Sequence, residues 1–167
     1  LGSRIEVDPL LPETLIGDQG LITRILAQFA DNAVKFTRRG GIRLRAQQIG
    51  RAEQGQVRVR LLVEDSGIGI AQADQERLFK PFSQLDDRPD RQFEGIGLGL
   101  ALARQLAGLM RGKVGVESEL GKGSLFWLEL NLRQGAADAD VEPPLRPDAA
   151  APPPTTAMTA AGGDLPQ

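Results

Sequence analysis

Two kinds of periodicity, one directly after the other, constrain the fold of this chain most strongly. Residues 18–36 begin with Asp18, a residue type that caps helix N-termini. Their apolar side chains recur at helical spacing: Ile22, Ile25, Leu26, Phe29, Ala33, Val34 and Phe36. Gly40 and Gly41 end this predicted helix. Residues 42–47 and 57–63 then alternate apolar with charged or polar side chains, which predicts a hairpin of two strands, each with one face in solvent.

The rest of the sequence continues the same mixture of helical and strand patterns. The predicted elements are a short helix over 75–79 ended by Pro81, a polar loop over 83–94, a long helix from Leu98 to near Gly112, and strands around 114–116 and 125–130. Because helices and antiparallel strands interleave, the predicted class is α+β, with a layer of helices on one mixed sheet.

The composition excludes several kinds of chemistry. The chain has no His and no Cys, which rules out a Ser-His-Asp triad, a Cys nucleophile, a disulfide framework, an ordinary zinc site and a phosphohistidine within this chain. A formal net charge of −2 argues against nucleic-acid binding. No apolar run approaches the roughly 18 residues that cross a bilayer. We expect a cytoplasmic domain without direct membrane contact; a membrane anchor elsewhere in a longer protein stays open.

The sequence changes character after Gln134. Residues 135–167 hold seven of the 11 prolines and nine alanines, with few large apolar side chains. This composition predicts a disordered linker or tail, because such a segment cannot bury enough apolar surface to fold. The expected domain boundaries are therefore 1–134 for the folded part and 135–167 for the linker, which leads to a further domain or simply ends the chain.

The first predicted helix carries a polar cluster. Gln28, Asn32 and Lys35 stand at i, i+4 and i+7 and therefore share one helix face. An amide oxygen is a hard ligand that suits Mg²⁺, and a Lys one turn away can meet a phosphate. The alternative is an ordinary solvated helix face.

Two glycine-rich segments follow. Asp65 ends a predicted strand and precedes Gly67 and Gly69, so its carboxylate can accept a hydrogen bond from an exocyclic amine such as that of adenine, where glycines permit close approach. The alternative is a turn that only terminates the strand. Residues 95–100, Gly-Ile-Gly-Leu-Gly-Leu, open a helix whose backbone N–H groups point at anions. Their spacing fits neither the dinucleotide-binding fingerprint nor a P-loop.

The order and spacing of these segments resemble those of a known family. Asn-Ala-x-Lys-Phe-Thr at 32–37, Asp-x-Gly-x-Gly at 65–69, Phe-x-Pro-Phe at 79–82 and Gly-x-Gly-Leu-Gly-Leu at 95–100 are similar to the N box, first G box, F box and second G box of sensor histidine kinases. Gly-x-Gly-Ser at 121–124 is similar to the family's next glycine turn. The resemblance runs from about Ile5 to Leu132.

This resemblance implies the ATP-binding catalytic domain of a hybrid sensor histidine kinase, in the GHKL superfamily of ATPases and kinases. The implied fold is a two-layer α/β sandwich of the Bergerat type. Its mixed, mostly antiparallel sheet is covered by helices on one face, and residues 83–94 form a mobile ATP lid.

The resemblance also implies ATP and Mg²⁺ as cofactors and assigns residue roles. Asn32 and Lys35 are the predicted catalytic residues: Asn32 is expected to bind Mg²⁺, and Lys35 is expected to contact a phosphate. Gln28 is expected to be a second ligand of the metal. Asp65 is expected to accept from the adenine amine. The other predicted nucleotide contacts are Phe36, Gly67, Gly69, Ile70, Arg91, Gly95, Gly97, Leu98, Gly99, Leu100 and Ser124. Arg91, or Arg88 in the same loop, is expected to neutralise the γ-phosphate.

Two positions depart from the family pattern. Gln28 stands where related kinases have Asn, and ATPase relatives have a Glu that activates water. Gln cannot take a proton from water, which argues against efficient hydrolysis. Glu94 stands where a glycine commonly precedes the second G box.

The predicted function is transfer of the γ-phosphoryl group of ATP to a histidine in two-component signal transduction. Because the chain has no His, the acceptor must lie on a separate dimerisation and phosphoacceptor domain, expected N-terminal to this chain. A response-regulator receiver domain is a second expected partner. The alternatives are a catalytically degenerate kinase domain that acts as a protein-interaction module, an ATPase of the same fold, and a serine kinase of the anti-sigma type.

Overall fold

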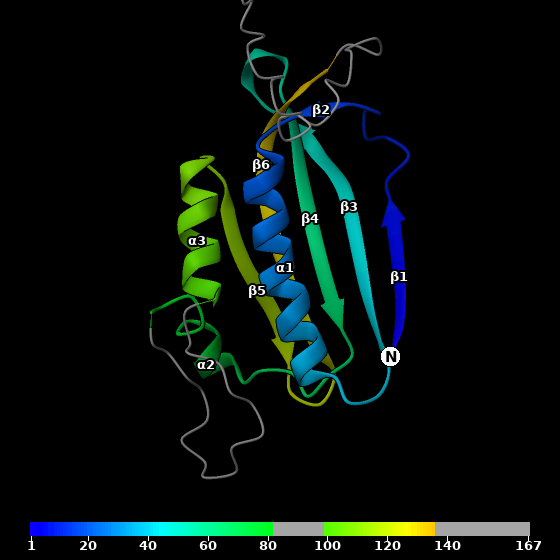
Figure 1. Ribbon diagram of the computed structural model, residues 1–167, viewed down its shortest axis with the longest axis vertical. Coiled ribbons are helices and arrows are strands. Elements are labelled where there is room, and N and C mark those ends of the chain that lie inside the picture. The colour runs from blue at the N-terminus through cyan, green and yellow to red at the C-terminus, as the bar shows by residue number, and fades with distance from the viewer. Residues whose placement is uncertain (82–98, 136–167) are drawn as a thin grey trace, which may run out of the picture. The chain divides into compact units, whose positions relative to one another are not determined.

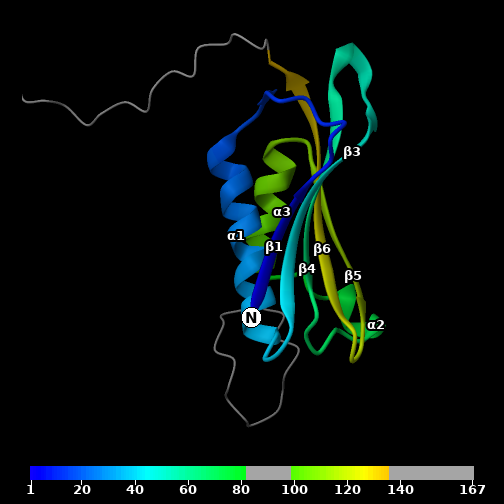
Figure 2. The same ribbon diagram turned by 90° about the vertical axis from the view of Figure 1, so that its right-hand side faces the viewer.

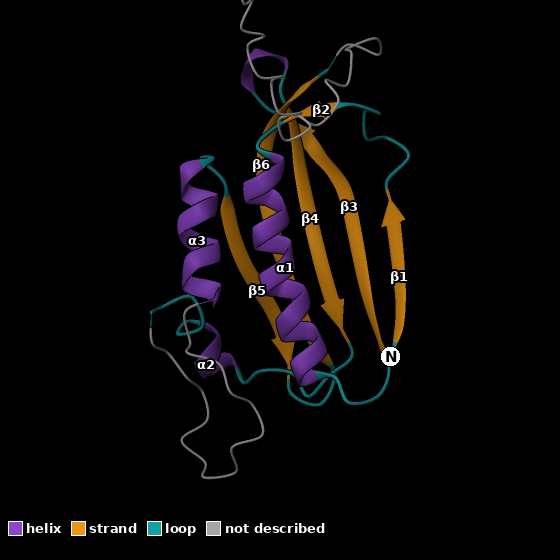
Figure 3. Cartoon of the chain, in the orientation of Figure 1, coloured by secondary structure: helices purple, strands orange, loops and turns teal. Residues whose placement is uncertain are grey.

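A six-stranded sheet with two long helices on one face forms the described part of the chain (Figures 1 and 2). The computed structural model describes residues 1–81 and 99–135. The strands are β1 (Gly2–Val7), β2 (Leu15–Ile16), β3 (Gly41–Arg51), β4 (Val57–Asp65), β5 (Lys113–Glu119) and β6 (Gly123–Gln134). The helices are α1 (Gln19–Phe36), α2 (Gln72–Gln75) and α3 (Gly99–Leu109), with one 3-10 turn, η1 (Glu53–Gly55) (Figure 3).

The sheet is mixed and mostly antiparallel, as predicted. Its order is β1-β3-β4-β6-β2, and β5 also pairs with β6. Only β1 with β3 is a parallel pair among these strands. The α+β class and the two-layer arrangement are therefore confirmed. The predicted lid, 83–94, lies outside the described residues.

Helix α1 forms where the periodicity places it. The Asp18 carboxylate accepts a hydrogen bond from the Leu21 N–H at 3.0 Å, which caps the helix. Ile25, Phe29 and Ala33 recur every four residues and are fully buried against the sheet. The apolar stripe of α1 therefore fixes which way its polar face points.

The core lies between the helices and the sheet. The rings of Phe29 on α1 and Phe126 on β6 stack with centroids 5.4 Å apart. On α3 the buried positions include Ala103 and Ala107, whose small side chains let that helix approach closely. No helix within residues 1–81 and 99–135 has both the length and the apolar character to cross a membrane.

One secondary-structure prediction is wrong, and two strands were not predicted. The short helix predicted over 75–79 is wrong: α2 spans Gln72–Gln75, and the chain continues to residue 81 in turns. Strands β1 and β2 were not predicted. β1 presents Ile5 and Val7 largely exposed, at 76% and 65%, so backbone pairing with β3 rather than burial holds it in place.

Candidate nucleotide site

Four segments that are distant in sequence meet at one end of the sheet. The C-terminal ends of α1 and β4, the start of α3 and the β5–β6 hairpin all lie at the lower end in Figure 1. Figure 2 shows the ends of α1 and β4 and the hairpin at the same level. This end thus carries the N box, the first G box and the last glycine turn. Of the second G box the structure describes only Gly99 and Leu100; Arg91, Gly95, Gly97 and Leu98 lie outside the described residues.

Asp65 is the buried charge of this region. It is the last residue of β4, where side chains alternate between faces, and it shares the helix-covered face with Val59 and Val63. It is 5% exposed, and its Oδ1 accepts a hydrogen bond from the Gly67 N–H at 2.9 Å. Across the described segments Asp65 forms no ion pair.

Burial raises the pKa of the Asp65 carboxyl above its ordinary value of 3.8, because the charged form loses hydration. Hydrogen bonds from the backbone of Gly67 and Ser124 and from the Thr37 side chain oppose this shift, and the neighbouring charge of Glu64 adds to it. The site therefore holds an acceptor that is costly to keep ionised and has spare hydrogen-bonding capacity.

Thr37 is a site residue that the sequence reasoning did not single out. It follows α1 directly and is 2% exposed. Its hydroxyl lies close enough to lower the pKa of Asp65, yet its Oγ1 falls short of good hydrogen-bond geometry with any partner in the described part of the chain. The contact of Thr37 with Asp65 is therefore weak. The signal was present, because Thr37 is the last residue of the N box.

The first G box, residues 65–69, lies between the end of α1 and the β5–β6 hairpin and is hydrogen-bonded to both. The Ile68 N–H donates to the Phe36 carbonyl at 3.2 Å, and the Gly121 N–H donates to the Ile68 carbonyl at 2.7 Å. A Cβ on Gly67 would collide with the Phe36 carbonyl oxygen, and Gly69 has a φ of +70°. Only glycine permits this close approach and this turn, which together hold Asp65 between the helix end and the hairpin.

Ser124 stands directly opposite Asp65 in the β4–β6 ladder and is 7% exposed. Phe36 and Ile70 are half-buried on either side of the same region, and Ile70 packs against the core. Leu100 also packs against the core. The structure therefore brings Asp65, Ser124, Gly67, Gly69 and Ile70 together.

The polar face of α1 reaches α3. Gln28 and Asn32 are half-buried and Lys35 is exposed, all on one face of the helix. The Gln28 Oε1 occupies the place that a Cβ on Gly99 would take, so the first residue of α3 lies against the Gln28 side chain. The roles of Gln28, Asn32 and Lys35 in metal and phosphate binding stay predictions.

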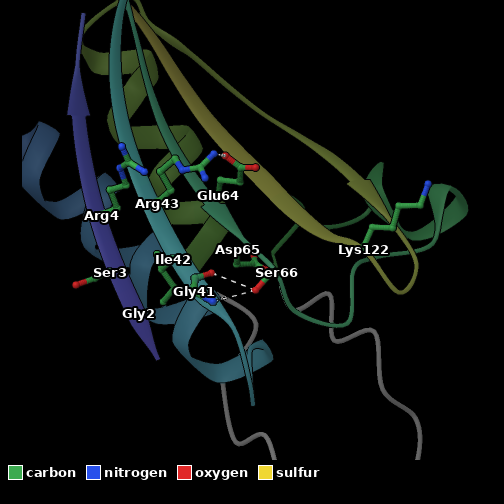
Figure 4. A pocket seen from close by; sticks show the side chains of 10 residues that line it. All are labelled: Gly2, Ser3, Arg4, Gly41, Ile42, Arg43, Glu64, Asp65, Ser66 and Lys122. Carbon is green, nitrogen blue, oxygen red and sulfur yellow. Dashed lines mark hydrogen bonds and ion pairs between the residues drawn. The ribbon is translucent and has the colours of Figure 1, made fainter.

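A separate hollow lies on the face of the sheet opposite the helices (Figure 4). Its volume is about 350 Å³, and Arg4, Arg43 and Glu64 lie along it. The Glu64 carboxylate accepts from Arg43 at 3.4 Å, so the charges there neutralise one another. Asp65 also lines this hollow, but none of the other predicted nucleotide contacts within residues 1–81 and 99–135 does. The hollow is therefore mainly an ion-paired surface that borders the candidate site at Asp65.

A family model described as histidine kinase-, DNA gyrase B-, and HSP90-like ATPase matches residues 17–134. The chain belongs to this family. Within it the chain is an ATP-binding domain of the histidine kinase type, and the family resemblance seen in the sequence is confirmed.

The relatives of this histidine-kinase-type domain are sensor and hybrid kinases. The sensor histidine kinase AruS of Pseudomonas aeruginosa is 40% identical over 126 residues, which cover 75% of this chain and 12% of AruS. Hybrid signal transduction histidine kinase F of Dictyostelium discoideum is 43% identical over 129 residues, covering 77% of this chain and 12% of that protein. The chain thus spans about an eighth of these curated relatives.

Solved structures agree with the fold. Full-length ShkA, crystallised in complex with AMPPNP, is 40% identical and matches with a TM-score of 0.68 over 81% of this chain and 26% of that one. The mycobacterial sensor histidine kinase MprB matches with a TM-score of 0.64 over 80% of this chain and 83% of that one; at 23% identity it supports the fold alone.

Proposed function

We propose that this domain binds Mg-ATP and transfers the γ-phosphoryl group to a histidine on a separate dimerisation and phosphoacceptor domain. The observation that carries the proposal is the buried Asp65 carboxylate, which backbone N–H groups hold at the end of the sheet where the polar face of α1 meets α3. Asp65 has no counter-ion within residues 1–81 and 99–135. A buried ionisable group of this kind, at the end of the sheet where the family's sequence boxes meet, is typical of a ligand site.

The residues present fit a nucleotide base. The exocyclic amine of adenine is a donor. Asp65 accepts from the backbone of Gly67 and Ser124, and a carboxylate has about four acceptor positions, so acceptor capacity is left. The buried Thr37 hydroxyl beside it is also available to a ligand or a water molecule. ShkA, the relative crystallised with AMPPNP, supports the same kind of ligand here.

The chain's own residues would bind and orient rather than supply a nucleophile. Asn32 offers an amide oxygen to Mg²⁺, and Lys35 on the same face offers a positive charge to a phosphate. ATP supplies the phosphoryl group when bound. Catalysis by this domain then consists of positioning and charge neutralisation, with the attacking histidine brought by the other domain.

The same proposal covers the protein beyond this domain. Residues 1–134 form the catalytic domain, and the Ala- and Pro-rich residues 135–167 link it to a receiver domain. The relative named as hybrid signal transduction histidine kinase F supports such an arrangement. The expected partners are thus the phosphoacceptor domain and a response-regulator receiver.

The first test is binding. Calorimetric titration of the chain with Mg-ATP should give a saturable signal that weakens when Mg²⁺ is chelated. Asn32→Ala should weaken Mg-ATP binding about tenfold, because it removes a metal ligand. Asp31→Asn changes the adjacent, exposed residue of α1 and should leave the affinity unchanged. Equal effects of the two changes would contradict the metal-ligand role of Asn32.

The second test is transfer. The chain is mixed with labelled ATP and a separately produced helical hairpin that carries a phosphoacceptor histidine. Label should appear on the hairpin as an acid-labile phosphoryl group and should be absent from the chain alone. Release of free phosphate without the hairpin would favour an ATPase, and acid-stable label on a serine would favour a serine kinase. Absence of nucleotide binding would favour a non-catalytic interaction module.

A further inference from the structure

A single serine hydroxyl connects three parts of the candidate site. Ser118 lies in β5 and is half-buried. Its Oγ accepts a hydrogen bond from the Ile70 N–H at 2.7 Å, donates to the Gly123 carbonyl at 2.8 Å, and lies 2.8 Å from the Ser124 Oγ. The first G box, the hairpin turn and Ser124 therefore all meet at this one oxygen.

The three contacts fix where the protons lie. A hydroxyl has one proton to give and two lone pairs to receive with. The Gly123 carbonyl can only accept, so the Ser118 proton must point to it. The Ile70 N–H can only donate, so it takes one lone pair of Ser118. The contact with Ser124 is then satisfied only if Ser124 donates its proton to Ser118.

The Ser124 hydroxyl can therefore only accept hydrogen bonds from a ligand, because its own proton is donated to Ser118. It stands opposite Asp65 in the β4–β6 ladder, where directly opposed side chains have their Cβ atoms about 4.5–5.5 Å apart. Both residues are buried. Two hydrogen-bond acceptors, a carboxylate and a hydroxyl oxygen, are thus placed side by side.

Gln75 completes the arrangement from α2. Its Nε2 donates to the Ile70 carbonyl at 3.0 Å and to the Ser118 carbonyl at 2.8 Å. Both backbone polar groups of Ile70 are consequently held, one by the Ser118 hydroxyl and one by the Gln75 amide. The Ile70 side chain is predicted to line the base pocket, so the hydroxyl of Ser118 also affects the position of this lining residue.

We propose that Ser118 is a positioning residue that sets the base selectivity of the site. By taking the Ser124 proton, it makes Ser124 an acceptor beside Asp65, and a pair of acceptors selects a base edge that carries an exocyclic amine. This inference rests on the proposed nucleotide-binding function. A merely structural role of Ser118 in the hairpin would change stability without changing which base is preferred.

The test compares ATP with purine riboside triphosphate, which lacks the exocyclic amine and keeps the neighbouring ring nitrogen as an acceptor. Dissociation constants of both nucleotides are measured by calorimetry for the full chain. Wild type should prefer ATP. In Ser118→Ala the Ser124 proton is released and can donate to the ring nitrogen, so the preference for ATP should fall about fivefold, the effect of one neutral hydrogen bond.

Three further variants separate positioning from folding. Ser118→Thr keeps the hydroxyl and should keep the preference for ATP. Ser124→Ala removes the acceptor itself and should lower the preference by a similar factor, which tests the idea even if Ser118→Ala does not fold. Ser66→Ala removes a hydroxyl that bonds the Gly41 backbone at the same end of the sheet, and it should leave the preference unchanged.

The possible failures are distinct. If wild type binds ATP while Ser118→Ala, or Ser124→Ala in its place, keeps the wild-type ratio of dissociation constants, the positioning role is overturned and the proposed function stands. If wild type binds neither nucleotide, the proposed function is wrong and the positioning role falls with it.

Discussion

Asp65 and Glu64 are adjacent carboxylates at the end of β4, but they lie on opposite faces of the sheet. The Glu64 side chain is 38% exposed, and its carboxylate pairs with Arg43 at 3.4 Å and Arg45 at 3.2 Å. Asp65 is 5% exposed and receives backbone N–H groups in place of cations. In the part of the chain that the structure describes, side chains thus neutralise Glu64 but not Asp65.

The same contrast extends over the two faces. On the outer face Arg60 lies over the ring of Trp127, 5.2 Å from its centroid, and pairs with Glu129. On the helix-covered face the side chains of Ile25, Phe29 and Val63 are fully buried. Because a buried charge without a counter-ion is unfavourable, it persists where a ligand uses it. The comparison therefore favours the helix-covered face for the proposed nucleotide site, while paired charges lie on the outer face.

The largest expected effect concerns the core on the helix-covered face. Phe29→Ala removes a fully buried ring that stacks on Phe126, and it should lower the free energy of unfolding by about 3–5 kcal/mol. Val34→Ala on the same helix, where the side chain is 55% exposed, should change it by less than about 0.5 kcal/mol. Urea denaturation of both variants measures the difference. Similar losses would show that α1 does not pack as described.

The next largest effect concerns nucleotide affinity, which should depend on the Asp65 carboxylate and not on that of Glu64. Asp65→Asn keeps the shape but removes the charge, and it should weaken Mg-ATP binding about tenfold to a hundredfold, the range of a hydrogen bond to a charged group. Without nucleotide the variant should be at least as stable as wild type, because the charge it removes is buried and pairs with no cation of residues 1–81 and 99–135. Calorimetry measures the affinity and thermal unfolding the stability.

Glu64→Gln is the matched control, one residue away on the opposite face. It should leave the affinity for Mg-ATP unchanged, since the Glu64 carboxylate is already paired with Arg43 and Arg45, although it lines the same hollow as Asp65. If Glu64→Gln weakened binding as much as Asp65→Asn, the distinction between the two faces would be lost.

The sequence predicted those parts of the fold that depend on local patterns. Helix α1 was predicted from Asp18 and the apolar period, and both the cap and the buried stripe lie within the helix itself. β1 was missed because its stability comes from parallel pairing with β3, some 40 residues away in the register Ile5 with Leu44. The position of α2 was also missed, because Gln75, its last residue, is held in part by the backbone carbonyl of Ser118, 43 residues away in sequence.

The residues of the candidate site can also be separated into those that follow from a local pattern and those that depend on long-range pairing. Asp65, Gly67 and Gly69 were found from their spacing, because the turn that they form is local. Ser118 was not found, because its importance depends on the pairing of β5 with β6 and on contact with Ile70. Sequence patterns thus indicate candidate ligand contacts more readily than the residues that position those contacts.

A smaller effect follows from the pKa of Asp65, which burial raises above 3.8. Between 3.8 and the raised pKa, the folded protein binds more protons at this carboxyl than the unfolded chain does. The contribution of Asp65 to the free energy of unfolding therefore decreases as the pH rises through this window. The affinity for Mg-ATP should change in the opposite sense and fall as the pH is lowered through the same window, because the acceptor loses its charge.

Asp65→Asn supplies the control for both pH profiles. The difference between wild type and variant in stability, followed by urea denaturation at a series of pH values, isolates the contribution of this carboxyl. The corresponding difference in affinity should vanish at the acidic end of the window. A wild-type profile that the variant reproduces would contradict the assignment of the titration to Asp65.

The smallest expected effect lies on the outer face. Glu129→Gln removes the charge that pairs with Arg58 at 3.7 Å and with Arg60. The Glu129 side chain is only 12% exposed, but the Gln amide oxygen can still accept from Arg60, and both arginines keep access to water. The change should therefore lower the free energy of unfolding by about 1 kcal/mol. High salt should reduce this loss only slightly, because it screens the half-exposed Arg58 more than the largely buried carboxylate. Urea denaturation at low and high salt measures it, and the affinity for Mg-ATP should not change. A loss comparable to that of Phe29→Ala, or a weaker affinity, would mean that the paired charges of the outer face support the site as well as the surface.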